Sequence, residues 1–258
     1  MSGAGVVEPN PIGLFVCGVQ KGGTTSMDGY LRQHPQLSPP HHKELHLFDD
    51  EAQDWTGGPP LAIGAHYPPD DKGQIRYDCT PIYGFWPQSL ERIKAYNPAA
   101  RLVFLWRDPF ARAWSQWCME YARGAETLPF AEAIRAGRQR LAGAGATERA
   151  IRHFSYVERG QYGAQAQRAL ALFPREQILW LRSVDLARDH QTVLARVADF
   201  LKIAPFAPLP ARRDHANPQA HFPARPSRAD RELIMGELAE EMALFGALSG
   251  LELEEEPV

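Results

Sequence analysis

The sequence has few cysteines, no long apolar run and no excess of charge of either sign. Cys17, Cys79 and Cys118 are odd in number and widely spaced, which argues against a disulfide framework and against zinc-site spacing. No segment approaches the roughly 20 apolar residues that cross a bilayer, and residues 1–11 lack the regions of a signal peptide. We therefore expect a soluble, cytoplasmic protein that binds no membrane.

The charge balance also limits the partners. With 28 basic and 31 acidic residues the net charge is −3, so no global field attracts nucleic acid and any anion site must be local. Hydrophobic residues make up 44% and charged residues 23%, as in ordinary globular proteins. A chain of 258 residues is long enough to bury a core. We expect one domain over residues 1–258, with frayed termini at 1–11 and 252–258.

Strand-like and helix-like segments alternate along the chain. Short apolar runs rich in β-branched and aromatic residues predict strands, and apolar residues at helical spacing follow them. This alternation predicts an α/β fold with a mostly parallel, doubly wound central sheet and a phosphate-loop-like strand–loop–helix unit. The expected strands are 14–19, 101–106 and 177–181, and the expected helices are 27–31, 87–96, 109–121, 164–173 and 190–201.

The end of the chain has a different pattern. Residues 204–226 are rich in Pro, Arg and His without periodicity, which predicts a long surface loop. Ser227 and Asp230 then have the spacing of a capping box, and the following apolar stripe predicts a helix that ends at Gly250.

The first candidate site lies in residues 18–26, Gly-Val-Gln-Lys-Gly-Gly-Thr-Thr-Ser. A strand that leads through a glycine turn into a helix directs backbone N–H groups at an anion. Thr24 stands where the nucleoside-triphosphatase pattern requires lysine, and Lys21 lies three residues earlier. The alternative is a tight turn with a solvated Lys21.

A second candidate site follows the strand at 101–106. Arg107 stands at the strand's end and Ser115 two helical turns later. Ligands of doubly wound sheets bind at this carboxyl edge, where an arginine can pair with a phosphate dianion. The alternatives are an Arg107 that pairs with Asp108 and a Ser115 that faces a helix groove.

Together these segments resemble the sulfotransferases that use 3′-phosphoadenosine 5′-phosphosulfate (PAPS). The resemblance covers most of the chain and is closest to the branch of the heparan sulfate sulfotransferases and many bacterial relatives. It rests on residues 18–25, on Arg-Asp-Pro at 107–109, on Lys-Glu-Leu-His-Leu-Phe-Asp at 43–49 and on Arg-Gly-Gln-Tyr at 159–162.

The resemblance implies a role for each matching residue. Arg107 and Ser115 hold the 3′-phosphate of PAPS, Tyr162 lies near the nucleotide, Glu44 is the general base, and His46 lies beside it. The 5′-phosphosulfate is held by Lys21, Gly22, Gly23, Thr24, Thr25 and Ser26. PAPS is then a co-substrate, and we expect no metal requirement.

The sequence departs from the family's pattern in two places. Cys79 stands where many relatives carry a lysine, so any role of that charge is absent or supplied elsewhere. Residues 220–226 lack the Lys-Gly-Arg loop that often binds the nucleotide. His221, Arg225 and either Arg212 or Arg213 are the candidates to replace it, and the sequence does not choose between them.

The chemistry of sulfuryl transfer fits these residue types. Because its transition state is loose, positioning and charge stabilisation supply most of the catalysis. Lys21 would neutralise the charge on the bridging oxygen, and Glu44 would take the acceptor's proton. Glu44 has the alternative of a solvated charge. His46 has the alternatives of orienting the acceptor, contacting the sulfuryl oxygens, acting as the base, or a structural role.

The acceptor and the competing functions are less constrained. We expect a small sugar-like or natural-product hydroxyl, since no basic stripe suits a long polyanion; the sequence does not indicate the oligomeric state. Five aromatic residues are candidates for an acceptor wall, with the protein core as the alternative. They are Trp55, Tyr67, Tyr83, Trp86 and Trp117. The competing functions are a nucleoside-phosphate kinase and a nucleotide-binding module without catalysis.

Overall fold

The structure is a computed structural model that describes residues 10–56, 63–71, 73–142, 148–212, 222 and 225–257. The described residues form two compact units. The first consists of those in Met1–Trp106 and Arg168–Asp214, and the second of those in Arg107–Gln167 and His215–Val258. Helix α6 (Tyr162–Leu172) runs from the second unit into the first. One domain over the whole chain stays a prediction.

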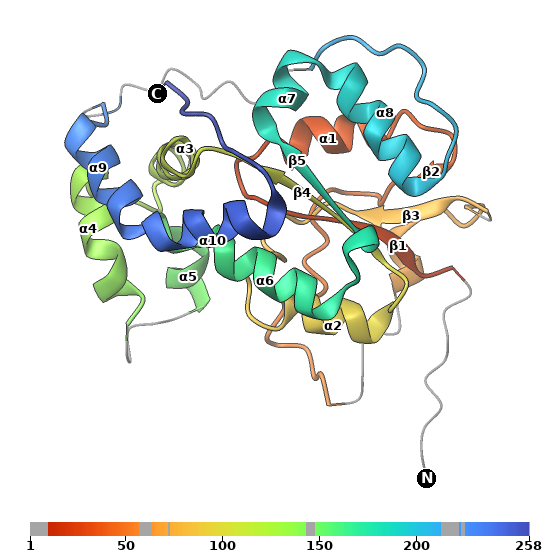
Figure 1. Ribbon diagram of the computed structural model, residues 1–258. Helices are drawn as coiled ribbons and strands as arrows, with labels where there is room; N and C mark the ends of the chain where they lie inside the picture. The colour runs from red at the N-terminus through yellow and green to blue at the C-terminus, as the bar shows by residue number, and fades with distance from the viewer. Residues whose placement is uncertain are drawn as a thin grey trace. The chain divides into compact units, whose positions relative to one another are not determined.

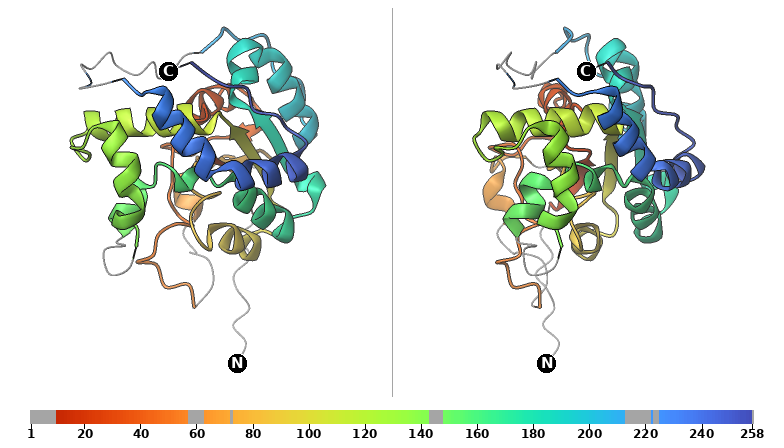
Figure 2. Two further views of the ribbon diagram at one scale, coloured as in Figure 1. Left: turned by 60° about the vertical axis from the view of Figure 1, so that its left-hand side comes forward. Right: turned by 90° about the vertical axis from the view of Figure 1, so that its left-hand side faces the viewer.

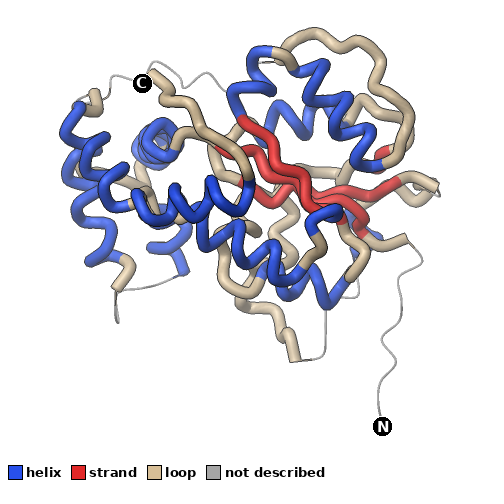
Figure 3. Tube along the Cα trace, viewed as in Figure 1, coloured by secondary structure: helices blue, strands red, loops and turns tan. Residues whose placement is uncertain are grey.

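The first unit contains a five-stranded sheet, drawn red in Figure 3. All four strand pairings are parallel, and the order is β2-β3-β1-β4-β5. This confirms the predicted parallel α/β sheet. The strands are β1 (Ile12–Gly18), β2 (Leu37–Ser38), β3 (Ile75–Asp78), β4 (Arg101–Trp106) and β5 (Ile178–Arg182).

The central strands are buried because helices cover both faces of the sheet. Leu14 to Cys17 of β1 are all fully buried, as their continuous apolar run requires. Alternate residues of β1, β3 and β4 pack against α1 (Thr24–Leu31) and α8 (His190–Leu201), with α7 (Ser183–Arg188) beside them. Helix α2 (Ser89–Tyr96) lies on the opposite face (Figure 1).

The described residues of the second unit contain helices and no strand. Helix α3 (Pro109–Ala122) packs against α9 (Arg228–Glu237) and the short helix η3 (Glu158–Gly160), and α4 (Phe130–Arg140) packs against α5 (Glu148–Phe154), as Figure 2 shows. Trp117, Phe130 and Tyr156 form the centre of the core. The buried Arg112 is held by the Tyr156 carbonyl and the Gln116 side chain.

The helix predicted to run from Ser227 to Gly250 is interrupted. The capping box at Ser227 and Asp230 is confirmed, but α9 ends at Glu237 and α10 (Ala239–Ser249) begins two residues later. The Leu238 side chain packs where a Cβ on Gly160 would stand, at 2.5 Å. The break between α9 and α10 therefore lies at a residue with close tertiary packing, which the apolar stripe in the sequence did not indicate.

The predicted late loop and the predicted strands differ less from the structure. Residues 204–212 have no regular structure, in agreement with the predicted loop, whereas most of 213–224 lies outside the described residues. Strands β2 and β3 were not expected. Among the described helices none has the length and apolar character that spanning a membrane requires.

Candidate active site

The loop between β1 and α1 is built so that only glycine fits at position 22. The Val19 N–H donates to the Leu105 carbonyl over 3.0 Å, and the Gly22 N–H donates to the Val19 carbonyl over 2.9 Å. A Cβ on Gly22 would lie 2.3 Å from the Leu105 oxygen. The loop therefore folds tightly onto the end of β4.

The same loop leaves the start of α1 open. Gly23 is the N-cap residue, has φ of 91°, and provides no side-chain cap. The first-turn N–H groups have no partner within a helix, and they carry its positive end. Thr24 is buried, while Thr25, Ser26 and Lys21 are partly exposed. Residues 21–26 thus lie together in the loop and the first turn of α1, and their binding of an anion stays a prediction.

A second element of the first unit carries Glu44. Both oxygens of its carboxylate have basic neighbours: Lys43 Nζ bonds Oε1, and His46 Nε2 lies 3.6 Å from Oε2. His46 Nδ1 is 2.8 Å from Oδ2 of the fully buried Asp49. Glu44 is therefore ion-paired and 39% exposed, so it is a partly solvated charge with fixed partners.

The end of β3 holds this element in place. The buried Asp78 carboxylate accepts from the Leu45 N–H over 3.4 Å and from the Tyr83 hydroxyl over 2.7 Å. That hydroxyl accepts from the Leu47 N–H over 3.0 Å. Glu44 and His46 have φ of 62° and 54°, a conformation that non-glycine residues adopt only when their surroundings fix it.

The pairing fixes the charges of the network. Burial raises the pKa of Glu44, but hydrogen bonds and charge from His46 and Lys43 outweigh it and lower the value to about 2. Hydrogen bonds to Asp49 and Glu44 raise the pKa of His46 to about 9 against burial. At neutral pH Glu44 is ionised and His46 is protonated. A protonated His46 cannot accept a proton, which argues against His46 as the base.

Cys79 links the two elements. Its thiol is fully buried and donates to the Thr24 carbonyl over 3.3 Å. Burial raises the pKa of the thiol well above its usual range, so no charge stands there. The Lys43 ammonium lies within electrostatic range of the Cys79 side chain and of the Asp28 carboxylate of α1. The Lys43–Glu44 pair therefore lies beside the start of α1.

In the second unit, Arg107 and Ser115 occupy the predicted positions on the chain. Arg107 directly follows β4, and Ser115 is a nearly buried residue of α3, 8% exposed. Asp108 caps α3 by accepting from the Ala111 N–H over 2.7 Å. Its ion-pair partner is Arg231, at 2.7 Å. The expected alternative, an Arg107 that pairs with Asp108, is not what the structure shows.

The other predicted nucleotide residues differ in burial. Tyr162 is fully buried in the second unit, with its ring 5.8 Å from that of Phe245. Arg225 is exposed and outside regular structure. Arg212 lies against α1, where its N–H donates to the Tyr30 hydroxyl over 2.8 Å. The two other candidates for the late loop, His221 and Arg213, lie outside the described residues.

The aromatic residues proposed as an acceptor wall belong mostly to the core. Trp55 is partly exposed and stacks on Phe48, with the Arg92 guanidinium over its ring at 4.3 Å. The other four are buried, namely Tyr67, Tyr83, Trp86 and Trp117. Within the described ranges, no three acidic, histidine or cysteine side chains are grouped to hold a metal ion.

Comparison with known proteins identifies this architecture. The model of the sulfotransferase domain matches residues 11–209, which include both glycine-loop and Arg107–Ser115 segments. The chain belongs to the sulfotransferase family.

Sequence and structure relatives agree with this assignment. Heparan sulfate glucosamine 3-O-sulfotransferase 3B1 of Mus musculus is 32% identical over 78% of this chain and 48% of the relative. The 3-O-sulfotransferase 6 of the same organism is 30% identical over 72% and 51%. The chain thus spans about half the length of these relatives. A sulfotransferase from Alicyclobacillus acidocaldarius has a TM-score of 0.71 and 25% identity, with 95% of this chain and 98% of the other covered.

Sequence reasoning missed several residues that contact the candidate base Glu44 or hold its segment. Lys43 and Asp49 stand in the motif at 43–49, yet their pairing with Glu44 and His46 was not foreseen. Asp78 and Tyr83 flank the Cys79 departure and hold the Glu44 element. Their signal was the run Asp-Cys-Thr-Pro-Ile-Tyr at 78–83, which we considered for its missing lysine and for Tyr83 as an acceptor-wall aromatic, not as a support for Glu44.

Proposed function

We propose that this chain transfers a sulfuryl group from PAPS to an acceptor hydroxyl. One observation carries the proposal: an ion-paired glutamate lies beside the uncapped start of a helix that follows a glycine-only loop. Cys79 lies between the two, because its thiol donates to the Thr24 carbonyl while Lys43, which pairs with Glu44, lies within electrostatic range of it. An anion site and a carboxylate base are therefore neighbours within one unit.

In this proposal the loop positions the donor. The first-turn N–H groups of α1 and the side chains of Thr24, Thr25 and Ser26 hold the 5′-phosphosulfate. Lys21 faces the bridging oxygen, which leaves with the 5′-phosphate, and stabilises its charge. In the second unit Arg107 and Ser115 hold the 3′-phosphate, with Tyr162 and Arg225 as further nucleotide residues. PAPS supplies the sulfuryl group, and we propose that no metal is needed.

Glu44 would take the acceptor's proton. With a pKa of about 2, it is too weak a base to deprotonate a free alcohol. The alcohol becomes strongly acidic as its oxygen bonds to sulfur, so a weak, always ionised base suffices at that stage. His46, protonated and fixed by Asp49, orients the carboxylate. This order agrees with a loose transition state in which proton transfer comes late.

For the acceptor we propose a carbohydrate or similar small-molecule hydroxyl. Two relatives are named heparan sulfate glucosamine 3-O-sulfotransferases. Trp55, with Phe48 behind it, is the one aromatic candidate with an exposed surface among those the sequence suggested. A second function, nucleotide binding without catalysis, is favoured by the uncharged Cys79.

The test is an acceptor screen. Purified protein is incubated with PAPS and a panel of sugars and alcohols, and mass spectrometry measures the gain of one sulfuryl group. Turnover that persists with a chelator supports the proposal. Turnover that a chelator abolishes, with phosphate transferred from a nucleoside triphosphate, indicates the kinase. Tight binding of adenosine 3′,5′-bisphosphate without transfer to any acceptor indicates the binding module.

A further inference from the structure

The C-terminal tail is tied down in the second unit, although we expected it to fray. Helix α10 ends at Ser249, and Gly250, with φ of 69°, reverses the chain. The Leu251 N–H then donates to the Ser249 hydroxyl over 3.1 Å. Residues 251–257 continue without regular structure. Their sequence, Leu-Glu-Leu-Glu-Glu-Glu-Pro, makes this tail strongly acidic.

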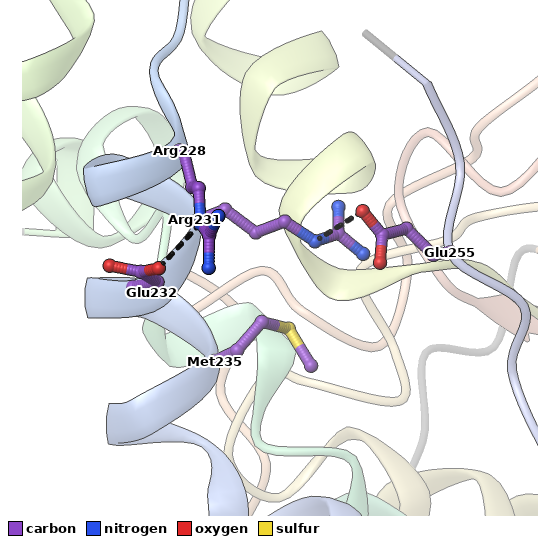
Figure 4. A pocket seen from close by; sticks show the side chains of 5 residues that line it. All are labelled: Arg228, Arg231, Glu232, Met235 and Glu255. Atoms are coloured by element: carbon purple, nitrogen blue, oxygen red, sulfur yellow. Dashed lines mark hydrogen bonds and ion pairs between the residues drawn. The ribbon is translucent and has the colours of Figure 1, made fainter.

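Two consecutive glutamates of the tail bind two arginines. Glu256 Oε2 accepts from Arg107 Nε over 3.0 Å and lies 2.9 Å from its Nη2. Both side chains are largely buried, with 22% and 23% exposed. Glu255 Oε1 lies 3.1 Å from Arg231 Nε, as Figure 4 shows. The tail therefore covers the arginine that we propose for the 3′-phosphate.

Arg231 has two contacts besides the one with the tail. Its guanidinium pairs with Asp108 at 2.7 Å and lies 5.1 Å from the centre of the Phe110 ring. Asp108 is the residue next to Arg107 in sequence, and it is nearly buried. Asp108 accepts from Nη2 over 2.7 Å and from Nη1 over 3.4 Å, whereas Glu255 pairs with Nε, so the tail glutamate is an additional partner on the remaining edge of the guanidinium.

A pocket lies where the tail meets α9. Glu255 supplies one wall, and the other lining residues come from α9 (Figure 4); the lining is Arg228, Arg231, Glu232, Met235 and Glu255. Arg228 pairs with Glu232 at 2.8 Å on the exposed side. Release of the tail would remove the Glu255 wall and leave the Arg231 Nε edge open to solvent anions.

We propose that residues 252–257 form an acidic strap that occupies Arg107 and Arg231 in the free protein, and that the 3′-phosphate of the donor displaces it. Arg231 is then a second arginine of the 3′-phosphate site. The inference rests on the proposed function, since it takes Arg107 as a donor ligand. Carboxylate and phosphate compete for the same guanidinium N–H groups, so the two occupants exclude each other.

The strap lowers the apparent affinity for donor nucleotides. If the tail is closed about nine-tenths of the time, the apparent dissociation constant rises about tenfold, in inverse proportion to the open fraction. Only a ligand with a 3′-phosphate competes with Glu256. A ligand with a 5′-phosphate alone binds the α1 loop of the first unit and has no such competitor. The strap therefore predicts a selective effect on one class of nucleotide.

The experiment compares Glu256→Gln with Glu252→Gln in the full chain. Both substitutions remove one charge from the tail, but Glu252 is exposed, whereas Glu256 is paired with Arg107. Calorimetry measures the affinities for adenosine 3′,5′-bisphosphate and adenosine 5′-phosphate at low and high salt. We expect Glu256→Gln to bind the bisphosphate about 5- to 10-fold more tightly at low salt, with less gain at high salt. The affinity of Glu256→Gln for adenosine 5′-phosphate should equal that of the parent. Glu252→Gln should bind both nucleotides as the parent does.

The role of Arg231 is tested in a variant that lacks the two strap carboxylates that pair with arginines, Glu255 and Glu256. In Glu255→Gln/Glu256→Gln protein, Arg231→Gln should weaken bisphosphate binding about tenfold and leave 5′-phosphate binding unchanged. Circular dichroism checks that each variant folds. An unchanged bisphosphate affinity in this comparison would show that Arg231 serves Asp108 and α3 only.

Two results overturn the strap. The first is a Glu256→Gln protein whose bisphosphate affinity equals that of the parent. The second is an equal gain for both nucleotides, which reports general electrostatics. If neither parent nor variant prefers the bisphosphate to the 5′-phosphate, the donor assignment itself fails, and the strap fails with it. The failure of the strap alone is thus distinguishable from the failure of the proposed function.

Discussion

At the residue scale, substitution of Glu44 distinguishes a catalytic role of this carboxylate from a structural one. Glu44→Gln keeps the size of the side chain but removes its basicity, so turnover should fall by roughly 10²–10⁴. The free energy of unfolding should change by about 1 kcal/mol or less, because the ion pair is partly exposed. Nucleotide affinity should stay near that of the parent. Steady-state kinetics, urea denaturation and calorimetry measure the three quantities.

A weaker loss would change the mechanism and not the family. Near-normal turnover of Glu44→Gln would move the search for the base to other groups. An intermediate loss with weaker acceptor binding would make Glu44 an acceptor-positioning residue. The matched control is Glu91→Gln, which changes an exposed glutamate of α2 in the same way. This control variant should keep full turnover.

Lys43 should set the pH range in which Glu44 works. Its charge and hydrogen bond lower the pKa of Glu44, so Lys43→Met should raise that pKa. The protonated carboxyl then persists to higher pH, and the acid limb of kcat/KM moves upward in pH. The charges around the carboxylate that take part are Lys43, His46, Asp49, Asp28 and Asp78.

The measurement is a pH profile of kcat/KM for the parent, Lys43→Met and the control Lys94→Met. Lys94 bonds a backbone carbonyl of its own helix end and lies away from this network. An acid limb that does not move, together with lower activity, would assign Lys43 to folding or to acceptor contact. Rescue of Lys43→Met by Cys79→Lys would show that a charge at either position serves the same carboxylate.

These partners explain why the site was only partly predictable. Glu44 and His46 were identified through the resemblance of residues 43–49 to a family motif. Their ionisation depends on Lys43 and Asp49, and that pairing requires the left-handed backbone at Glu44 and His46. Sequence patterns predict left-handed residues mainly through glycine, which is absent from both positions.

At the element scale, the β1–α1 loop predicts two different effects of glycine replacement. Gly22 has no room for a Cβ, which would lie 2.3 Å from the Leu105 oxygen. Gly23 has room, with its nearest neighbour at 3.6 Å, but its φ is 91°. Gly22→Ala must therefore displace the loop or β4, whereas Gly23→Ala costs about 1–2 kcal/mol of backbone strain.

We expect Gly22→Ala to lose nucleotide binding and to be the less stable variant. Gly23→Ala should retain weaker binding. Gly73→Ala, with φ of 83° and nothing within 4 Å, reports the strain of a positive φ alone. Urea denaturation and nucleotide titration of the three proteins check the order. Equal effects at positions 22 and 23 would contradict the close contact with Leu105.

The elements themselves were predictable where burial is uniform. Strands β1, β4 and β5 are continuous apolar runs, because helices cover both faces of the sheet. Strand β3 was missed because Arg76 and Asp78 interrupt its apolar pattern; both are buried, and Arg76 is neutralised by Asp71. Strand β2 has only two residues, which are too few to show the alternation of apolar and polar residues that predicts a strand. The break at Leu238 follows from its packing on Gly160, which no local pattern contains.

At the scale of the whole molecule, a net charge near zero conceals local anion sites. The net charge of −3 predicted no general attraction for polyanions. The structure shows basic groups held by carboxylates from the same chain: Lys43 by Glu44, Arg107 by Glu256 and Arg231 by Asp108. An anion that binds Arg107 must therefore replace Glu256, which favours ligands of high charge density such as a phosphate dianion over weakly charged ones.

Ligand linkage makes this argument testable on the intact protein. Adenosine 3′,5′-bisphosphate at about 100 times its dissociation constant should stabilise the parent by roughly 2.7 kcal/mol. For a chain of this length that corresponds to a rise in Tm of about 5–10 °C.

In Arg107→Ala the bisphosphate should lose about 1.5–3 kcal/mol of binding free energy, because a charge-assisted pair is removed. The shift with adenosine 5′-phosphate should be the same in both proteins, and a chelator should alter none of the shifts. Arg138→Ala removes an arginine that is 73% exposed in the same unit and is the control. If Arg107→Ala still distinguishes the two nucleotides as the parent does, Arg107 serves only to hold Glu256, and the 3′-phosphate must be bound by other residues.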